Sequence, residues 1–148
     1  MNSVLDKLVE YKSRHPFTVM WRIRRHAKVI QCNLHEGEEV LYAFGGQKDN
    51  NHFGFFNTII VVLTNERLIV AQKRVFPGYS LNAITPDMFN DLQIISGLVW
   101  GAVNIDTVKE AVYVSNLSKS ALPEIQKTIT KFMITEKKKY PIREKNNE

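Results

Sequence analysis

The residues best suited to chemistry lie in one short stretch near the N-terminus, where arginines, a lysine and a tryptophan follow closely on one another. On a helical wheel at about 100° per residue, the apolar residues of this stretch share one narrow sector and the cations cover the rest. The tryptophan falls among the cations and could contact an arginine one turn later. Such a face can dock on anionic lipid, nucleic acid or an acidic protein surface. The candidate partner- or anion-binding residues are Trp21, Arg22, Arg24, Arg25 and Lys28.

The same helix also has an ordinary structural interpretation, in which its apolar stripe packs on the rest of the protein and its arginines are solvated or paired. Residues 1–31 hold seven Lys/Arg and two Asp/Glu, residues 32–115 hold five and nine, and residues 116–148 hold eight and four. An acidic middle therefore lies between two basic ends. Ion pairing within the chain and pairing between subunits both remain open.

A second candidate contact is Lys48, in the polar loop that follows Gly45-Gly46. Recognition of a multiply charged phosphate headgroup needs several clustered cations. This loop offers one lysine beside Asp49. We therefore expect Lys48 to make at most a single contact, and we do not expect headgroup binding at this loop.

Catalysis has little support in the sequence. The four histidines, His15, His26, His35 and His52, are not spaced as a helical metal-binding pair. Phosphate-binding glycine loops and serine nucleophile elbows are absent from the sequence. Cys32 is expected to be a small buried apolar residue. The carboxylates Asp87, Asp91 and Asp106 are expected to be separate, solvated turn residues. We expect no enzyme activity, no metal, no cofactor and no small-molecule substrate.

The composition is that of one small globular domain. The chain has 148 residues, of which 44% are hydrophobic and 24% charged, with a net charge of +5. A single cysteine excludes an internal disulfide and suits a reducing compartment. No apolar run approaches the roughly 20 residues of a membrane span. Asp6 and Glu10 interrupt the order of a signal peptide, so we expect a cytoplasmic protein.

The N-terminal third has the pattern of two helices. In the first, Ser3 is a candidate N-cap and the break falls at Ser13–Pro16. The second is expected over about residues 17–33. The apolar residues of the first helix are Val4, Leu5, Leu8 and Val9, and the stripe of the second is Met20, Ile23, Ala27, Ile30 and Leu34.

The middle of the chain changes to short β-branched and aromatic runs separated by turn residues. The first run is expected to stop at Gly45-Gly46. The other strands are expected over about residues 53–63, 67–71, 79–84, 90–98, 99–105 and 111–114. A final amphipathic helix follows, with Ser118 or Ser120 as its cap and Pro123 in its first turn. Its stripe is Leu122, Ile125, Ile129 and Phe132. We predict a mainly β α+β fold, a seven-stranded antiparallel barrel capped by a C-terminal helix and preceded by an N-terminal helical extension.

Several segments resemble bacterial pleckstrin-homology (PH) domains of the YokE-like type. They are Glu36–Gly46, the hairpin Val62-Leu63-Thr64-Asn65-Glu66-Arg67-Leu68-Ile69, the later stretch Ile94–Gly101, and Val114–Leu117 before the final helix. The resemblance covers roughly residues 34–135. It implies a PH-like fold and a binding role, and it brings no catalytic residues.

Three partner classes follow from these features. The leading expectation is a protein-interaction module, self-associating through an open sheet edge or through the apolar residues of the first helix. The alternative is peripheral membrane association through the basic helix, and the third is nucleic-acid binding. We expect residues 1–34 to form the helical extension, 35–136 the PH-like domain, and 137–148 a charged tail that frays.

Overall fold

The computed structural model describes residues 3–49, 57–73 and 78–140. Its helices are α1 (Val4–Arg14), α2 (Ile23–Gln31) and α3 (Leu122–Lys137), with short 3₁₀ turns η1 (Pro86–Met88) and η2 (Lys119–Ala121). Its strands are β1 (Val40–Gln47), β2 (Thr58–Thr64), β3 (Leu68–Lys73), β4 (Tyr79–Ile84), β5 (Phe89–Ser96), β6 (Trp100–Thr107) and β7 (Ala111–Ser118). None of the helices in these ranges is long and apolar enough to cross a membrane. Most of the predicted charged tail, and the first residues of the strand predicted over 53–63, lie outside the described residues.

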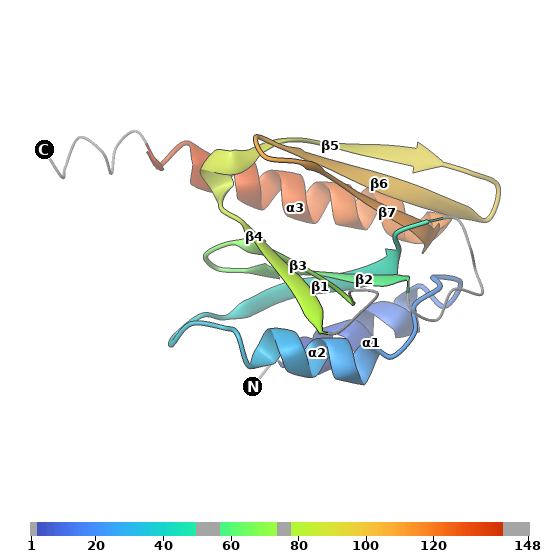
Figure 1. The fold of residues 1–148 in the computed structure, drawn as a ribbon. Coiled ribbons are helices and arrows are strands. Elements are labelled where there is room, and N and C mark those ends of the chain that lie inside the picture. Colours follow the sequence, from blue (N-terminus) through green and yellow to red (C-terminus); the bar gives the residue numbers. More distant parts are fainter. Residues whose placement is uncertain (1–2, 50–56, 74–77, 141–148) are drawn as a thin grey trace, which may run out of the picture.

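The seven antiparallel strands form one sheet in the order β4-β3-β2-β1-β7-β6-β5. Strands β1 and β7 meet through the single register pair of Gln47 with Ser115, so the sheet divides into two halves. Figure 1 shows α3 between these halves, with α1 and α2 on the outer side of the β1–β4 half. The predicted fold class is confirmed as a curled half-barrel with a C-terminal helix.

The prediction that Gly45-Gly46 ends the first strand is wrong, because β1 continues through both glycines to Gln47. The glycines are there for close packing. A Cβ atom on Gly46 would collide with the Ser115 carbonyl oxygen and lie 2.8 Å from Val114 Cγ1. A glycine inside a strand often marks such a close backbone approach. Gly46 therefore lets β7 come close enough to β1 to join the two halves, while Gly45 leaves room for Ile60 and Met20.

The final helix begins without the predicted serine cap. Its N-cap is Ala121, and η2 separates Ser118 from the helix, while Pro123 does lie in the first turn as expected. The fourth residue of its buried stripe is Met133 rather than Phe132, which is only half-buried. A step of four in place of three keeps the stripe on the side that faces the core.

Helix α1 is built into the core of this chain. Ser3 forms the predicted cap, as part of a reciprocal capping box with Asp6. Val4 and Leu8 are fully buried, and Leu5 packs against the core. Val4 and Leu8 are therefore not available for the expected intersubunit contact, because they are used within the chain, whereas Val9 is 52% exposed.

The second helix is shorter than predicted and starts at Ile23. The preceding residues are tied to the sheet, because the Val19 amide donates to the Asn116 carbonyl at 2.9 Å. Met20 is buried, although it lies outside the helix. Cys32 is exposed, so its predicted burial is wrong.

Two of the three predicted turn carboxylates lie in strands instead. Asp91 and Asp106 are directly opposite each other in the β5–β6 register. Asp87 does lie in a turn, η1, where its carboxylate accepts a hydrogen bond from the Thr85 hydroxyl at 2.5 Å. Asp91 falls within the strand predicted over about residues 90–98, and Asp106 directly follows the strand predicted over about 99–105, so their expected place in turns is wrong.

The close approach of β1 to β7 gives a stability prediction. Changing Gly46→Ala should lower the free energy of unfolding by about 2 kcal/mol, because overpacking forces the backbone of β7 away. The measurement is chemical denaturation of both proteins. The exposed strand residue Gln93 is a control, and Gln93→Ala should change stability by less than about 0.5 kcal/mol. Equal losses in the two variants would contradict the role given to Gly46.

Candidate functional site

A buried ion pair joins the start of β1 to the β2–β3 hairpin. Arg67 donates from Nε to Glu38 Oε1 at 2.9 Å and from Nη2 to Oε2 at 3.0 Å, a two-pronged arrangement. The Thr64 hydroxyl donates to Oε1 at 2.7 Å, and the His35 amide donates to Oε2 at 2.8 Å. Four hydrogen bonds therefore satisfy a carboxylate whose side chain is fully buried.

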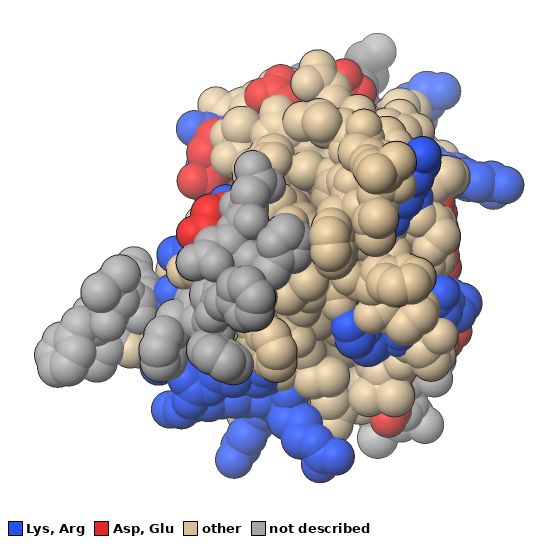
Figure 2. All heavy atoms as spheres, turned by 90° about the vertical axis from the view of Figure 1, so that its right-hand side faces the viewer, with Lys and Arg blue, Asp and Glu red and all other residues tan. Residues whose placement is uncertain are grey.

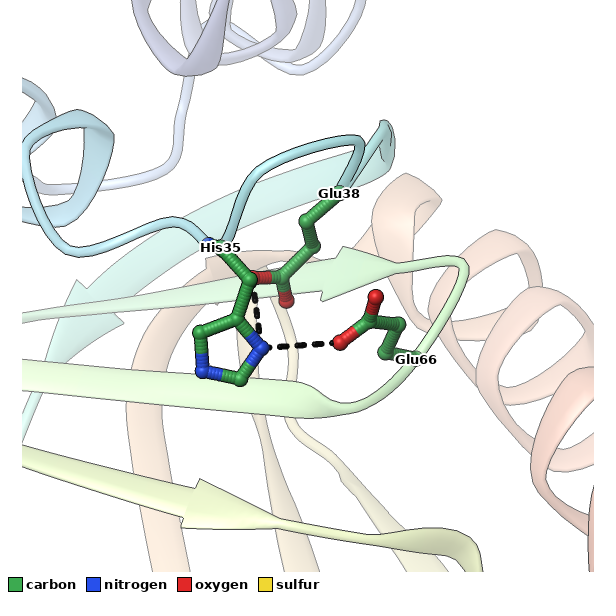
Figure 3. Close-up of side chains that lie close together, drawn as sticks. All are labelled: His35, Glu38 and Glu66. Carbon is green, nitrogen blue, oxygen red and sulfur yellow. Dashed lines mark hydrogen bonds and ion pairs between the residues drawn. The ribbon is translucent and has the colours of Figure 1, made fainter.

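Two exposed side chains adjoin this pair and form a group with the composition of a metal site. His35 Nδ1 lies 2.9 Å from Glu66 Oε2 and 3.8 Å from Glu38 Oε2 (Figure 3). The possible ligand atoms of these three residues lie within 4.8 Å of one another. A cation would have to draw Glu38 away from Arg67, leaving a guanidinium without its counter-ion. The geometry therefore assigns Glu38 to Arg67 rather than to a metal.

The other side chains of the hairpin motif form hydrogen bonds with backbone groups. Thr64 Oγ1 accepts from the amides of Glu66 and Arg67, each at 3.1 Å. The Asn65 side chain accepts from the Glu39 amide at 2.8 Å, and the Asn65 amide donates to the Glu39 carbonyl. The stretch Thr64–Arg67, which carries the family resemblance, thus forms a structural clamp between β1 and the β2–β3 hairpin.

The α2 cations face solvent while the apolar side of the helix faces the barrel. Ala27 and Ile30 are buried, whereas Arg24, Arg25 and Lys28 are exposed. The ion pairs of the described ranges include none made by those three exposed cations. The structural interpretation of the stripe is therefore correct. Pairing of these three cations with the acidic barrel does not occur in the described part of the chain.

The other predicted site residues are placed differently. Trp21 precedes the helix, and its amide donates to Thr58 Oγ1 at 2.8 Å. The expected contact with Arg25 one turn later assumed that Trp21 is helical, so the spacing no longer supports it. Arg22 is the N-cap in a left-handed conformation, with φ of 56°. Lys48 follows β1 and its amide donates to the Asn57 carbonyl. None of the described contacts brings Lys48 to the α2 cations.

A third surface was not predicted as a site. The tip of the β5–β6 hairpin is closed by the Gly97 amide, which donates to the Trp100 carbonyl, and it leaves Leu98 93% exposed. The Trp100 indole donates to the Phe17 carbonyl at 2.6 Å, so the segment before α2 adjoins the tip. We call the exposed residues Phe17, Ile94, Ile95, Leu98, Val99 and Trp100 the apolar hairpin surface. The signal in the sequence was the run of three apolar residues between Gly97 and Gly101, where turns ordinarily carry polar residues.

Figure 2 shows the face that includes the right-hand side of Figure 1. Uncharged side chains cover much of it, and Lys and Arg side chains gather at its lower edge, where α2 lies in Figure 1. This face therefore has a large uncharged region and a basic lower edge. Large exposed apolar patches mark interaction sites more often than they mark unused surface.

The buried pair predicts how stability depends on pH. Burial alone would raise the pKa of Glu38, but the hydrogen bonds from Arg67, His35 and Thr64 lower it from 4.5 to about 2. A lowered pKa gives stability that is present above pH 4.5 and lost as the pH falls toward 2. Glu38→Gln should cost about 3 kcal/mol at neutral pH, because Arg67 loses its counter-ion, and should flatten this acid dependence.

Denaturation curves measured between neutral and acidic pH test this prediction. Glu66→Gln is the matched control, since Glu66 is exposed and touches only the rim of the clamp. It should keep both the stability and the acid dependence of the wild type. A Glu38→Gln protein as stable as wild type would show that the pair is not needed.

The chain resembles the crystal structure of a pleckstrin homology domain from Shewanella amazonensis, with 18% identity, a TM-score of 0.48, and coverage of 74% of this chain and 86% of that chain. The comparison with curated proteins finds no match. Residues 34–131, about two thirds of the chain, match the family model described as Bacterial PH domain. That range contains the Glu38–Arg67 clamp and all seven strands, and the chain therefore belongs to the bacterial PH domain family.

Proposed function

We propose that this protein is a non-enzymatic binding module that self-associates, and that a second copy of the chain covers its β5 edge. The observation that carries this proposal is the exposure of an apolar sheet edge. Strand β5 is the last strand of the sheet, and its final four residues are all exposed. Ile95 is 54% exposed at this edge. An edge of this kind presents unpaired backbone groups that can pair with another strand.

The edge lacks the features by which proteins protect exposed strands. Residues Gln93–Ser96 contain no lysine, no proline and no other charged residue. Edge strands that stay free in solution usually carry such residues or a distortion that prevents pairing. The register irregularity of β5 lies at its other end, between Phe89 and Asp91. The C-terminal half of β5 is therefore suited to pairing.

The same edge is compatible with its own copy. A two-fold axis relates identical patches in a dimer, so each side must complement itself. An antiparallel pairing centred on Ile95 places that side chain against its counterpart. It separates the two Asp91 residues by eight positions, or about 26 Å at 3.3 Å per residue. Apolar residues then meet at the centre, and like charges stay apart.

Light scattering coupled to size exclusion tests this proposal. The wild type should have twice the 17.1 kDa mass of one chain, with a mass that falls on dilution. Ile95→Lys should give the single-chain mass, because it places two ammonium groups at the centre of the paired strands. Val108→Lys is the matched control, since Val108 is an exposed valine in the turn after β6. A wild type of single-chain mass at every concentration would refute self-association through β5.

Peripheral membrane association is the second candidate, and the solvent-facing cations of α2 favour it. A basic surface next to exposed aromatic side chains suits an anionic bilayer. The protein should cosediment with phosphatidylglycerol vesicles at low salt, and binding should fall as salt screens the charges. The triple change Arg22→Glu, Arg24→Glu and Arg25→Glu should abolish it. Failure of the wild type to sediment at low salt would exclude this function. Nucleic-acid binding stays a prediction that depends on the same cations.

A further inference from the structure

A groove runs between helix α3 and the first two strands of the sheet. Its volume is about 460 Å³, which is within the usual range of ligand-binding clefts. Leu41 of β1, Leu63 of β2 and Phe132 of α3 provide its apolar surface. The remaining lining residues all come from α3 and are Lys127, Thr128, Lys131, Thr135 and Glu136. We call these lining residues together the α3 groove.

The outward position of Leu41 results from a β-bulge. In the β1–β2 register, Val40 pairs with Thr64 and Tyr42 pairs with Leu63, so Leu41 is an extra residue between two successive pairs. Leu41 is 41% exposed, whereas every other residue of β1 is buried. Bulges redirect a side chain and often lie beside functional sites. Here the bulge places a large apolar side chain in the wall of the groove.

The wall formed by α3 consists of two rows of side chains along the helix. Residues four apart lie on the same helix face, so Lys127, Lys131 and Thr135 form one row. Thr128 and Phe132 form the next row in the same way. The buried stripe of α3 faces the core, so this wall is a second, partly exposed face of the helix. The groove therefore has an apolar floor and a rim that carries lysines.

The two lysines of this rim are exposed and lie one helical turn apart. Among the described residues, neither Lys127 nor Lys131 takes part in an ion pair. The two acidic residues of α3, Glu124 and Glu136, are each paired with other cations. Like charges one turn apart slightly destabilise a helix. Negative charge brought to this rim by a partner is therefore favourable.

We propose that the α3 groove binds an acidic amphipathic helix of a partner protein. The apolar side chains of that helix lie against Leu41 and Phe132, the mode by which amphipathic helices fill apolar grooves. Carboxylates one turn apart on its flank match the one-turn spacing of Lys127 and Lys131. A fatty acid combines the same two chemical characters but has only one carboxylate, so it leaves one lysine unpaired. The spacing of the lysines therefore favours the helix.

This surface is separate from the one proposed for self-association. The groove is formed by β1, β2 and α3, whereas the edge proposed to pair with a second copy belongs to β5. The Ile95→Lys variant should therefore bind the partner helix as the wild type does. Failure of self-association and failure of helix binding are thus measured independently.

Fluorescence anisotropy of the full chain with a labelled synthetic peptide tests the groove. The probe has about 15 residues, enough to form a helix, with leucines along one face and glutamates one turn apart beside them. It should bind the wild type saturably. The same peptide with glutamine in place of each glutamate should bind about tenfold more weakly, since each exposed lysine–carboxylate pair contributes about threefold. Leu41→Ala should also weaken binding about tenfold, because it removes an apolar anchor.

A double charge reversal tests the complementarity directly. Lys127→Glu with Lys131→Glu should abolish binding of the glutamate peptide and should allow binding of a peptide with lysine in place of each glutamate. This rescue also shows that the variant is folded. The matched control is Lys28→Glu with Lys109→Glu, which makes the same change of net charge at exposed lysines outside the groove. It should bind the glutamate peptide nearly as the wild type does.

Four results would overturn the proposal. The first is the absence of saturable binding of the glutamate peptide by the wild type. The second is an equal loss of binding in the control double variant, which would indicate diffuse attraction to a basic protein. Binding of laurate but not of the peptide would assign the groove to a fatty acid. A fall of the molar mass to that of one chain in Leu41→Lys would assign it to a second copy of the protein.

Discussion

The architecture depends on how closely β1 approaches β7. One register pair joins the two halves of the sheet, and side chains reinforce it. The Ser115 hydroxyl donates to the Gln47 carbonyl at 2.9 Å, and the Asn116 amide group donates to Gln47 Oε1 at 2.5 Å. The Asn116 carbonyl then accepts from Val19, which anchors the segment leading to α2. A single junction thus positions both the β5–β7 half and the helix that carries the cations.

Periodicity and turn residues were sufficient to predict most of this fold. The strand over Tyr79–Ile84, the Ser3 cap and the C-terminal helix follow from local pattern, because local sequence sets their geometry. Gly45-Gly46 was misread, because a glycine pair signals a turn and a close strand approach equally well. The choice between them depends on β7, about seventy residues away in the chain. The length of α2 was overestimated because Met20 extends the apolar stripe, although a hydrogen bond to β7 holds its neighbour Val19 in non-helical backbone.

The sites were less predictable than the fold, for the same reason. The arginines were evident in the sequence, but their neighbours were not. The ring of Tyr79 meets that of His26 in α2 because β4 pairs with β3, the strand against which α2 packs. Glu38 is one of three glutamates before β1, and only the position of Arg67 distinguishes it. Residue type can therefore identify candidate site residues, while the register of the sheet determines which of them come into contact.

Because α1 is buried, the range that matches the family differs from the range that shares one hydrophobic core. The family match starts at residue 34, yet Val4, Leu8 and Tyr11 belong to the same hydrophobic core as the strands. Arg14 and His15 pair with Glu124 at the start of α3, which connects the N-terminal helix to the C-terminal one. A fragment cut at the homology boundary would therefore lose part of its own interior and expose the outer side of β1 to water. The segment that matches the family is therefore shorter than the segment that forms one hydrophobic core in this chain.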